Sequence, residues 1–285
     1  MISDITLGQF FPGFSPLHKL DPRTKLVMAT IFIVAVFLAN NSLAFLLIAL
    51  IVCAMILISR ISFKVILKGI KPIAFILIFT SILNLFLTTG STEPIKLWIF
   101  TIYEEGVYRA IFMSLRVILL VVGTSMLLTY TTSPISLTDG LESLLSPLKR
   151  IGVPVHAFAM MMSIALRFIP TLVEETEKIM NAQKSRGADF SSGGLIKRSK
   201  ALIPILIPLF VSSFKRADEL ACAMECRCYR GDVNRTKLVK LEYKPRDLFA
   251  FISAILLLAL IIFVNILPDN ISFNSYLWQF VFYKI

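Results

Sequence analysis

The chain of 285 residues is 56% hydrophobic and only 16% charged, proportions that exclude an ordinary soluble domain and favour an integral membrane protein. Its 29 Lys and Arg residues outnumber its 18 Asp and Glu residues, which gives a formal net charge of +11. In so apolar a chain, this excess indicates loops that their positive charge keeps on the cytoplasmic side of the membrane. A lipid bilayer is therefore the expected partner, and no nucleic-acid partner is expected.

The N-terminal residues lack the pattern of a signal peptide. Such a peptide begins with a basic segment ahead of its apolar run, whereas here Asp4 precedes the first cation. The N-terminus is therefore expected to be mature and to lie in the cytosol.

Five apolar runs are predicted to cross the membrane, and they cover residues 26–39, 43–58, 72–89, 106–131 and 248–267. The first two are each shorter than the roughly 20 residues that span a bilayer, so they could also form one long tilted helix. That helix would place Arg23 and Lys25 on the side opposite to Arg60, against the positive-inside rule. A hairpin that turns at Asn-Asn-Ser, residues 40–42, keeps both basic groups inside, and we predict this hairpin.

The charges around the remaining runs set their direction. The loop after the third run carries Glu93, Glu104 and Glu105 against Lys96 and is expected outside the cell. The fourth run returns and contains Arg116, which could mark a functional site but is interpreted as a structural residue that snorkels or faces the bundle interior. The fifth run exits again, so the C-terminus and a short outer tail are predicted outside.

Most ionisable residues lie between the fourth and fifth runs, in a segment predicted to be a cytoplasmic domain. Three helices are expected there, at residues 136–151, 154–186 and 195–230. The last two are too apolar to face water and are interrupted by proline, so we expect them along the inner membrane face. The predicted fold is an all-α integral membrane protein with about five transmembrane helices and about three cytosolic or interfacial coupling helices. The predicted domains are residues 1–132, 133–247 and 248–285.

Two arginine residues occupy matching places at the ends of the second and third of these helices. Gly187 is a natural helix-ending residue, which puts Arg186 on the last turn of its helix. Aligning residues 182–187 with residues 223–228 places Arg227 opposite Arg186. An arginine at a helix C-terminus complements the helix dipole, but its planar fork can also bind carboxylates or carbonyls of a partner protein. The residue pattern alone supports the helix-dipole role and the partner-binding role about equally.

Three stretches carry a resemblance to a known family: SPLHKLDPRTKL at 15–26, NAQKSRGADF at 181–190, and the run at 194–231. With its membrane layout, the chain resembles the transmembrane T component of energy-coupling factor (ECF) transporters over nearly its whole length. In that family two Ala-Arg-Gly-type motifs end the long coupling helices, and each arginine engages one of two cytosolic ATP-binding-cassette (ABC) ATPases. The ATPase-docking residues that this resemblance implies are Ser185, Arg186, Gly187, Cys226, Arg227 and Cys228.

The second motif departs from the family pattern. Cys226 and Cys228 stand where the family usually has Ala and Gly. Arg230 and Gly231 match the Arg-Gly pair literally and form a secondary candidate, although the spacing after Ala-Met-Glu favours Arg227.

The resemblance implies a non-catalytic subunit of an importer for vitamins or other micronutrients in the bacterial plasma membrane. The subunit would transmit the ATP-driven motion of two ABC ATPases to a substrate-binding membrane S component. ATP and Mg would be bound by the ATPases, and this chain would bind no cofactor. The alternative is a self-contained secondary transporter or membrane enzyme, which needs ionisable residues that converge at mid-membrane. The predicted spans hold almost none apart from Arg116.

The sequence contains no motif for catalysis or metal binding. It has neither a phosphate-binding loop pattern nor a His-Glu-x-x-His pattern, and His18 and His156 are far apart. Cys222, Cys226 and Cys228 form no C-x2-C pair and have no histidine nearby, so they are interpreted as small buried cysteines. No catalytic residue and no metal ligand is predicted.

Overall fold

The computed structural model describes residues 10–87, 95–97, 100–188, 190, 194–231 and 241–266. The chain forms two compact units, which separate at residue 140 and again at residue 240. We call residues 10–140 and 241–266 the bundle unit and residues 141–231 the helix-pair unit.

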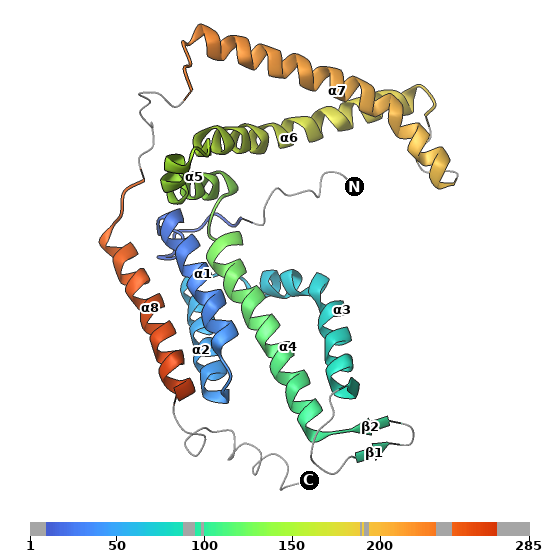
Figure 1. The fold of residues 1–285 in the computed structure, drawn as a ribbon. Helices are drawn as coiled ribbons and strands as arrows, with labels where there is room; N and C mark the ends of the chain where they lie inside the picture. Colours follow the sequence, from blue (N-terminus) through green and yellow to red (C-terminus); the bar gives the residue numbers. More distant parts are fainter. Residues whose placement is uncertain are drawn as a thin grey trace. The chain divides into compact units, whose positions relative to one another are not determined.

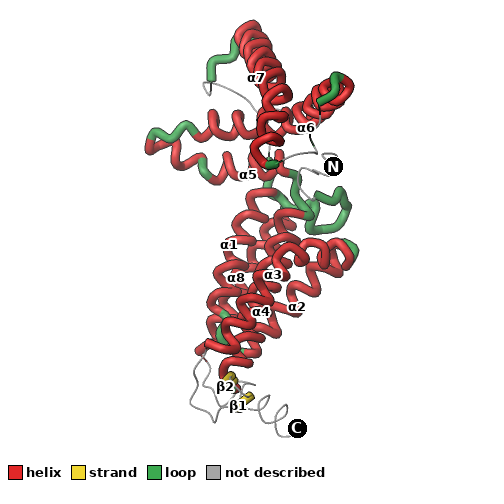
Figure 2. Tube along the Cα trace, turned by 90° about the vertical axis from the view of Figure 1, so that its right-hand side faces the viewer, coloured by secondary structure: helices red, strands yellow, loops and turns green. Residues whose placement is uncertain are grey.

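The bundle unit consists mainly of helices that run side by side in both views (Figures 1 and 2). In chain order its elements are α1 (Pro22–Leu38), α2 (Ser42–Ser59), α3 (Phe63–Leu87), β1 (Ile95–Leu97), β2 (Phe100–Ile102), α4 (Glu104–Thr124), the π-helix η1 (Ser125–Thr129) and α8 (Pro245–Ile266). The helix-pair unit holds the 3-10 helix η2 (Ser146–Ile151), α6 (Val155–Ser185) and α7 (Leu195–Cys226). Helix α5 (Pro134–Leu144) connects the two units.

The predicted hairpin of the first two apolar runs is confirmed. Helix α1 begins with Pro22 at its first position, where a proline costs no hydrogen bond, and the Asp21 carboxylate accepts the N–H of Arg23 at 2.9 Å. It ends at Leu38, and α2 begins at Ser42 after a short turn.

Among the described residues, five helices are long and apolar enough to cross a membrane, which is the number but not the set that the sequence predicts. They are α2, α3, α4 continued through η1, α6 and α8. Four of them coincide with predicted runs, whereas α6 was expected to lie along the membrane. Helix α1 has only 17 residues and is not among the five, although it packs against α4 and α8 inside the bundle unit.

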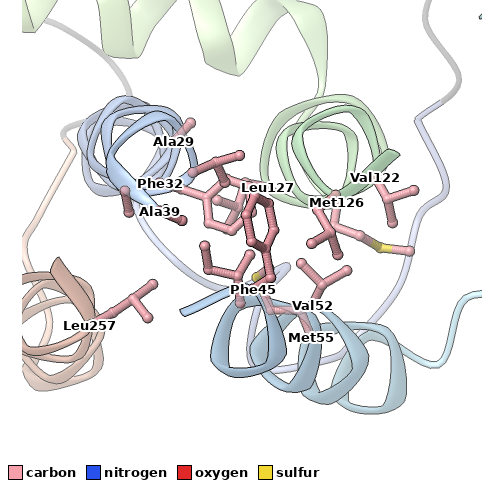
Figure 3. Packing of buried hydrophobic residues seen from close by; sticks show 14 of the residues in the cluster. Ala29, Phe32, Ala39, Phe45, Val52, Met55, Val122, Met126, Leu127 and Leu257 are labelled. Atoms are coloured by element: carbon pink, nitrogen blue, oxygen red, sulfur yellow. The ribbon is translucent and has the colours of Figure 1, made fainter. Parts of the chain in front are cut away.

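The hydrophobic core of the bundle unit lies between α1, α2, the α4–η1 helix and α8. Figure 3 shows that α1 contributes Phe32 and small residues such as Ala29 to this core. Phe45 of α2 and Leu127 of η1 belong to the same cluster. Small residues let helix backbones approach closely, which is how helices associate where lipid provides no hydrophobic drive. Ala35 on the same helix and Ala39, directly after its last residue, are also completely buried.

Arg116 on α4 has a structural role in this bundle. Its Nη2 donates to the carbonyl oxygen of Ala39 at 2.7 Å, and its guanidinium lies 5.4 Å from the centre of the Phe45 ring. The Ala39 carbonyl belongs to the turn after α1, where helix carbonyls lack intrahelical donors. The contact supports the interpretation that Arg116 faces the bundle interior.

A buried polar network, which the sequence analysis did not predict, ties the start of α1 to η1 and α8. Lys25 is only 2% exposed, and its Nζ donates to the carbonyl of Thr131 at 2.8 Å and to the Thr132 hydroxyl at 3.1 Å. Asp247, 3% exposed, accepts the backbone N–H of Asp21 at 2.7 Å and that of Lys244 at 2.8 Å. These contacts hold together the N-terminal ends of α1 and α8, which are more than two hundred residues apart in the sequence.

Several predicted boundaries are wrong. Helix α3 already begins at Phe63 and continues through Pro72, where the ring removes a backbone hydrogen bond, and Figure 1 shows this helix bent. The helix expected at 136–151 breaks at Leu145 into α5 and η2. The third coupling helix, expected to reach residue 230, ends at Cys226.

The all-α class is confirmed apart from one short hairpin. Strands β1 and β2 pair antiparallel, with Lys96 opposite Thr101, in the loop between the third and fourth runs. The acidic residue Glu93 of that loop and the predicted outer tail lie outside the described residues.

Candidate functional site

The end of α6 presents Arg186 in a defined cap. Arg186 is the C-cap residue, and Gly187 follows with a φ of +86°, in the left-handed region. The N–H of Gly187 donates to the carbonyl of Lys184 at 2.9 Å, and the N–H of Ala188 donates to that of Gln183 at 3.0 Å. These two hydrogen bonds form a Schellman motif, which satisfies the last carbonyls of the helix. The Arg186 side chain is exposed.

The end of α7 repeats this geometry residue for residue. Arg227 is the C-cap residue, and Cys228 has a φ of +55°. The N–H of Cys228 donates to the carbonyl of Glu225 at 2.8 Å, and the N–H of Tyr229 donates to that of Met224 at 3.0 Å. The Arg227 side chain is exposed, as that of Arg186 is.

The secondary candidate lies in a different position. Arg230 and Gly231 come after the end of α7, although the helix was expected to reach residue 230. Arg230 is exposed but does not share a helix face with Arg227, because the chain has already left the helix. The residue that matches Arg186 in place and cap geometry is therefore Arg227.

The capping position is strained at the second end and unstrained at the first. A non-glycine residue in the left-handed region has its Cβ too close to the backbone. Cys228 carries this strain, and Gly187 avoids it; a Cβ added at Gly187 would meet no atom within 4 Å, so only the backbone conformation opposes a side chain there.

We expect Cys228→Gly and Gly187→Ala to change their helix ends in opposite directions. The first relieves strain and should stabilise the end of α7 by about 1 kcal/mol, which slows amide hydrogen exchange at residues 223–229 about fivefold. The second introduces strain and should speed exchange at residues 182–188 by a similar factor. Exchange in the middle of α6 is the internal control. If both variants changed the exchange rate in the same direction, the shared cap geometry would be contradicted.

A polar contact fixes the crossing of α6 and α7. Glu175 accepts hydrogen bonds from Ser212 at 2.5 Å and from Arg216 at 2.6 Å, and Gln183 Nε2 donates to the carbonyl of Pro204 at 3.4 Å. Moving along α6 from 175 to 183 corresponds to moving backward along α7, so the helices run antiparallel. These contacts were not predicted from the sequence, because Glu175 and Arg216 are each one of several charged residues on their helices.

The antiparallel crossing sends the two arginines to opposite ends of the pair. Figure 1 shows the C-terminal end of α6 at one side of the helix-pair unit and that of α7 at the other. The contact of Gln183 with Pro204 puts Arg186 beside the first part of α7. From there to Arg227 the helix extends about 40 Å, at about 1.5 Å per residue. Each arginine can therefore contact a separate partner.

The cysteines near the second arginine are exposed, contrary to expectation. Cys222, Cys226 and Cys228 are exposed side chains on the last turns of α7 and just beyond them. Among the described residues no group of three potential ligands could hold a metal ion. His156 instead pairs with Glu142 at 2.9 Å, which joins α5 to the start of α6.

Comparisons with known proteins agree with this architecture. Residues 13–238 match the model of the family described as Cobalt transport protein (CbiQ). The chain is similar to proteins named "Energy-coupling factor transporter transmembrane protein EcfT". It is 52% identical to that of Clostridium kluyveri over 93% of this chain and 98% of the relative.

Two further relatives carry the same name. The protein of Ruminiclostridium cellulolyticum is 54% identical over 87% of this chain and 92% of the relative. That of Bacillus subtilis is 47% identical over 93% of this chain and 100% of the relative. With the family model covering most of the chain and relatives near half identity along almost all of it, the protein belongs to the EcfT family, the transmembrane components of energy-coupling factor transporters.

Proposed function

We propose that this chain carries two ABC ATPases on the ends of α6 and α7 and transmits their ATP-driven motion to a substrate-binding S component. The observation that supports this proposal is the repeated cap, which presents Arg186 and Arg227 in the same way at opposite ends of one antiparallel pair. A fixed helix end holds the guanidinium at a defined place, so two carbonyl or carboxylate acceptors on a partner can be bound with defined geometry.

The sides of the same helices supply the second contact in this proposal. Both expose large apolar residues that a water-facing helix would not carry: Phe158, Met161, Met162, Leu202, Ile203, Leu206, Ile207, Phe210, Val211 and Phe214. Contiguous exposed apolar surface marks a contact with protein or lipid. We assign it to the S component and the membrane face, and therefore treat α6 as a coupling helix rather than a span.

Motion can pass from the ATPases to the S component through the crossing of the two helices. The contact of Glu175 with Ser212 and Arg216 holds α6 and α7 together between their two arginine ends. When the ATPases approach each other on binding ATP, the ends move with them, and the apolar sides change their contact with the S component. Coupling then arises from contacts that differ between the two states.

The proposed orientation places the N-terminus and residues 133–247 in the cytoplasm of a bacterial cell and the C-terminus outside. Basic residues at the start of α3, namely Lys64, Lys68 and Lys71, are exposed and follow Arg60 at the same end of the bundle. The positive-inside rule assigns this end to the cytoplasm. ATP and Mg would be bound by the ATPases, with a vitamin or other micronutrient bound by the S component, and this chain would be non-catalytic.

The alternative, a self-contained transporter or membrane enzyme, needs an ionisable residue available to a substrate inside the membrane. Arg116 is the residue that could fill this role, but it already caps the turn after α1 and covers the Phe45 ring. An arginine engaged in this way supports the bundle and leaves the ECF subunit as the better explanation.

Co-purification tests the proposed function. The tagged full-length chain, extracted in mild detergent from its own cell, should bring down two ABC ATPase chains in stoichiometric amounts and a small membrane protein in addition. Substrate uptake into liposomes by this chain alone, without any ATPase, would overturn the proposal in favour of the self-contained transporter.

A further inference from the structure

Two cavities adjoin at one end of the bundle unit. The first, of about 850 Å³, is lined by the N-terminal segment 11–18 and by the connection from α2 to α3, residues 57–65. The second, of about 630 Å³, lies between α1, α2 and α8. Pro16 and Ile58 line both, so the two cavities are neighbours.

The two cavities differ in chemistry. The second is lined almost entirely by apolar side chains, among them Met28, Ile51 and Phe249, with Arg246 as its charged member. The first contains the serines Ser15 and Ser62 together with Arg60. No carboxylate is among the described residues that line either cavity. An apolar cavity next to a cationic, hydroxyl-bearing one complements a molecule with a long apolar tail and an anionic head.

Arg60 is held in an unusual backbone conformation at this junction. It ends α2 with a φ of 57° and a ψ of 26°, the left-handed region that non-glycine residues rarely adopt. Backbone strain of this kind often marks functional positions. The Arg60 side chain is exposed and has no hydrogen-bond or ion-pair partner within the described part of the chain.

His18 forms the wall of the first cavity and does not supply its charge. Ser15 Oγ lies 2.6 Å from His18 Nδ1, and the carbonyl oxygen of Phe11 lies 3.0 Å from His18 Nε2, so both ring nitrogens are engaged. Burial lowers the pKa of His18 below its ordinary value. This shift favours the neutral imidazole, so Arg60 is the cation of this cavity.

We propose that the two neighbouring cavities together bind an anionic phospholipid, with its phosphate at Arg60 and an acyl chain along α1, α2 and α8. The guanidinium fork binds phosphate in a bidentate manner. The lining helices α2 and α8 are long and apolar enough to cross a membrane, and helices that cross a membrane are surrounded by acyl chains. Basic pockets between membrane helices on the cytoplasmic side are suited to anionic head groups. This inference concerns a site separate from the arginine ends and does not depend on them.

Native mass spectrometry of the full-length chain tests the site. The protein is equilibrated in mixed micelles with equal amounts of phosphatidylglycerol and phosphatidylcholine, and the retained lipids are counted. We expect retention of phosphatidylglycerol about tenfold above phosphatidylcholine, and about equal retention for Arg60→Gln. The matched control is Lys68→Gln, which removes an exposed cation that lines neither cavity and should change the ratio less than about twofold.

Two further variants separate the site from the stability of the fold. Arg60→Gly suits the left-handed conformation, so it should keep or raise the melting temperature while it loses the preference for phosphatidylglycerol. Ala250→Phe fills the apolar cavity and should lower the retention of both lipids together. Equal retention of the two lipids by the native chain would overturn the proposal. So would a loss with Lys68→Gln as large as that with Arg60→Gln, or unchanged lipid retention by Ala250→Phe.

Discussion

Replacing both cap arginines by glutamate, Arg186→Glu with Arg227→Glu, should abolish substrate uptake while the chain stays inserted in the membrane at normal levels. In the proposed docking, each reversal places a carboxylate opposite the partner's carbonyls or carboxylates, so negative groups face each other at both ends of the helix pair. The fold should survive because both side chains are exposed and the caps are formed by backbone groups. Uptake in whole cells and the amount of protein in the membrane are the measurements.

A charge-matched variant provides the control for this experiment. Arg150→Glu with Lys215→Glu makes the same total change of charge on exposed residues of the same unit, away from both helix ends. This control should keep most of the uptake activity. Normal uptake by the cap double variant, or equal loss in the control, would show that the two arginines are not docking residues.

Arg227→Ala should lower transport and coupled ATP hydrolysis strongly, whereas Arg230→Ala should have little effect. Loss of a desolvated, hydrogen-bonded arginine at an interface costs about 2 kcal/mol or more, which is roughly thirtyfold in affinity. Arg230 lies beyond the helix end and outside the repeated cap, so it has no counterpart at the end of α6. Uptake and the retention of the ATPase in the purified complex are measured for both variants.

The cysteines beside Arg227 supply a further control. If the arginine alone carries recognition, Cys226→Ala with Cys228→Gly should preserve uptake, because glycine suits the left-handed position that Cys228 occupies. A severe defect in Arg230→Ala beside a silent Arg227→Ala would place the second docking residue at Arg230 instead.

The sequence predicts most of the architecture because hydrophobic runs and charged flanks are local signals. The hairpin of α1 and α2 followed from two short apolar runs and the positions of Arg23 and Arg60 relative to them. The end of α6 followed from Gly187, since glycine is the residue that most readily takes the left-handed cap.

The end of α7 was misplaced because its signal is hidden. The helix was expected to reach residue 230, but it stops at Cys226, and Cys228 takes the left-handed conformation against its own preference. The alignment of residues 182–187 with 223–228 contained the correct answer, since it matched Cys228 with Gly187.

Contacts between distant parts of the chain could not be predicted from local patterns. Lys25 was counted as a flanking positive charge, yet it is buried on Thr131 and Thr132. Asp247 anchors the backbone of Asp21, and nothing in either local sequence indicates the pairing. Such polar contacts depend on which helices become neighbours, and this is decided by packing.

Site-specific photo-crosslinking tests the central claim most directly. A photoreactive amino acid is placed at position 186 or 227 of the otherwise native chain in its own cell, with position 150 as the control. After illumination, positions 186 and 227 should each give a covalent adduct with an ABC ATPase chain, identified by mass spectrometry, and position 150 should not. Adducts from positions 186 and 227 with lipid or with other membrane proteins, and none with an ATPase, would contradict the account.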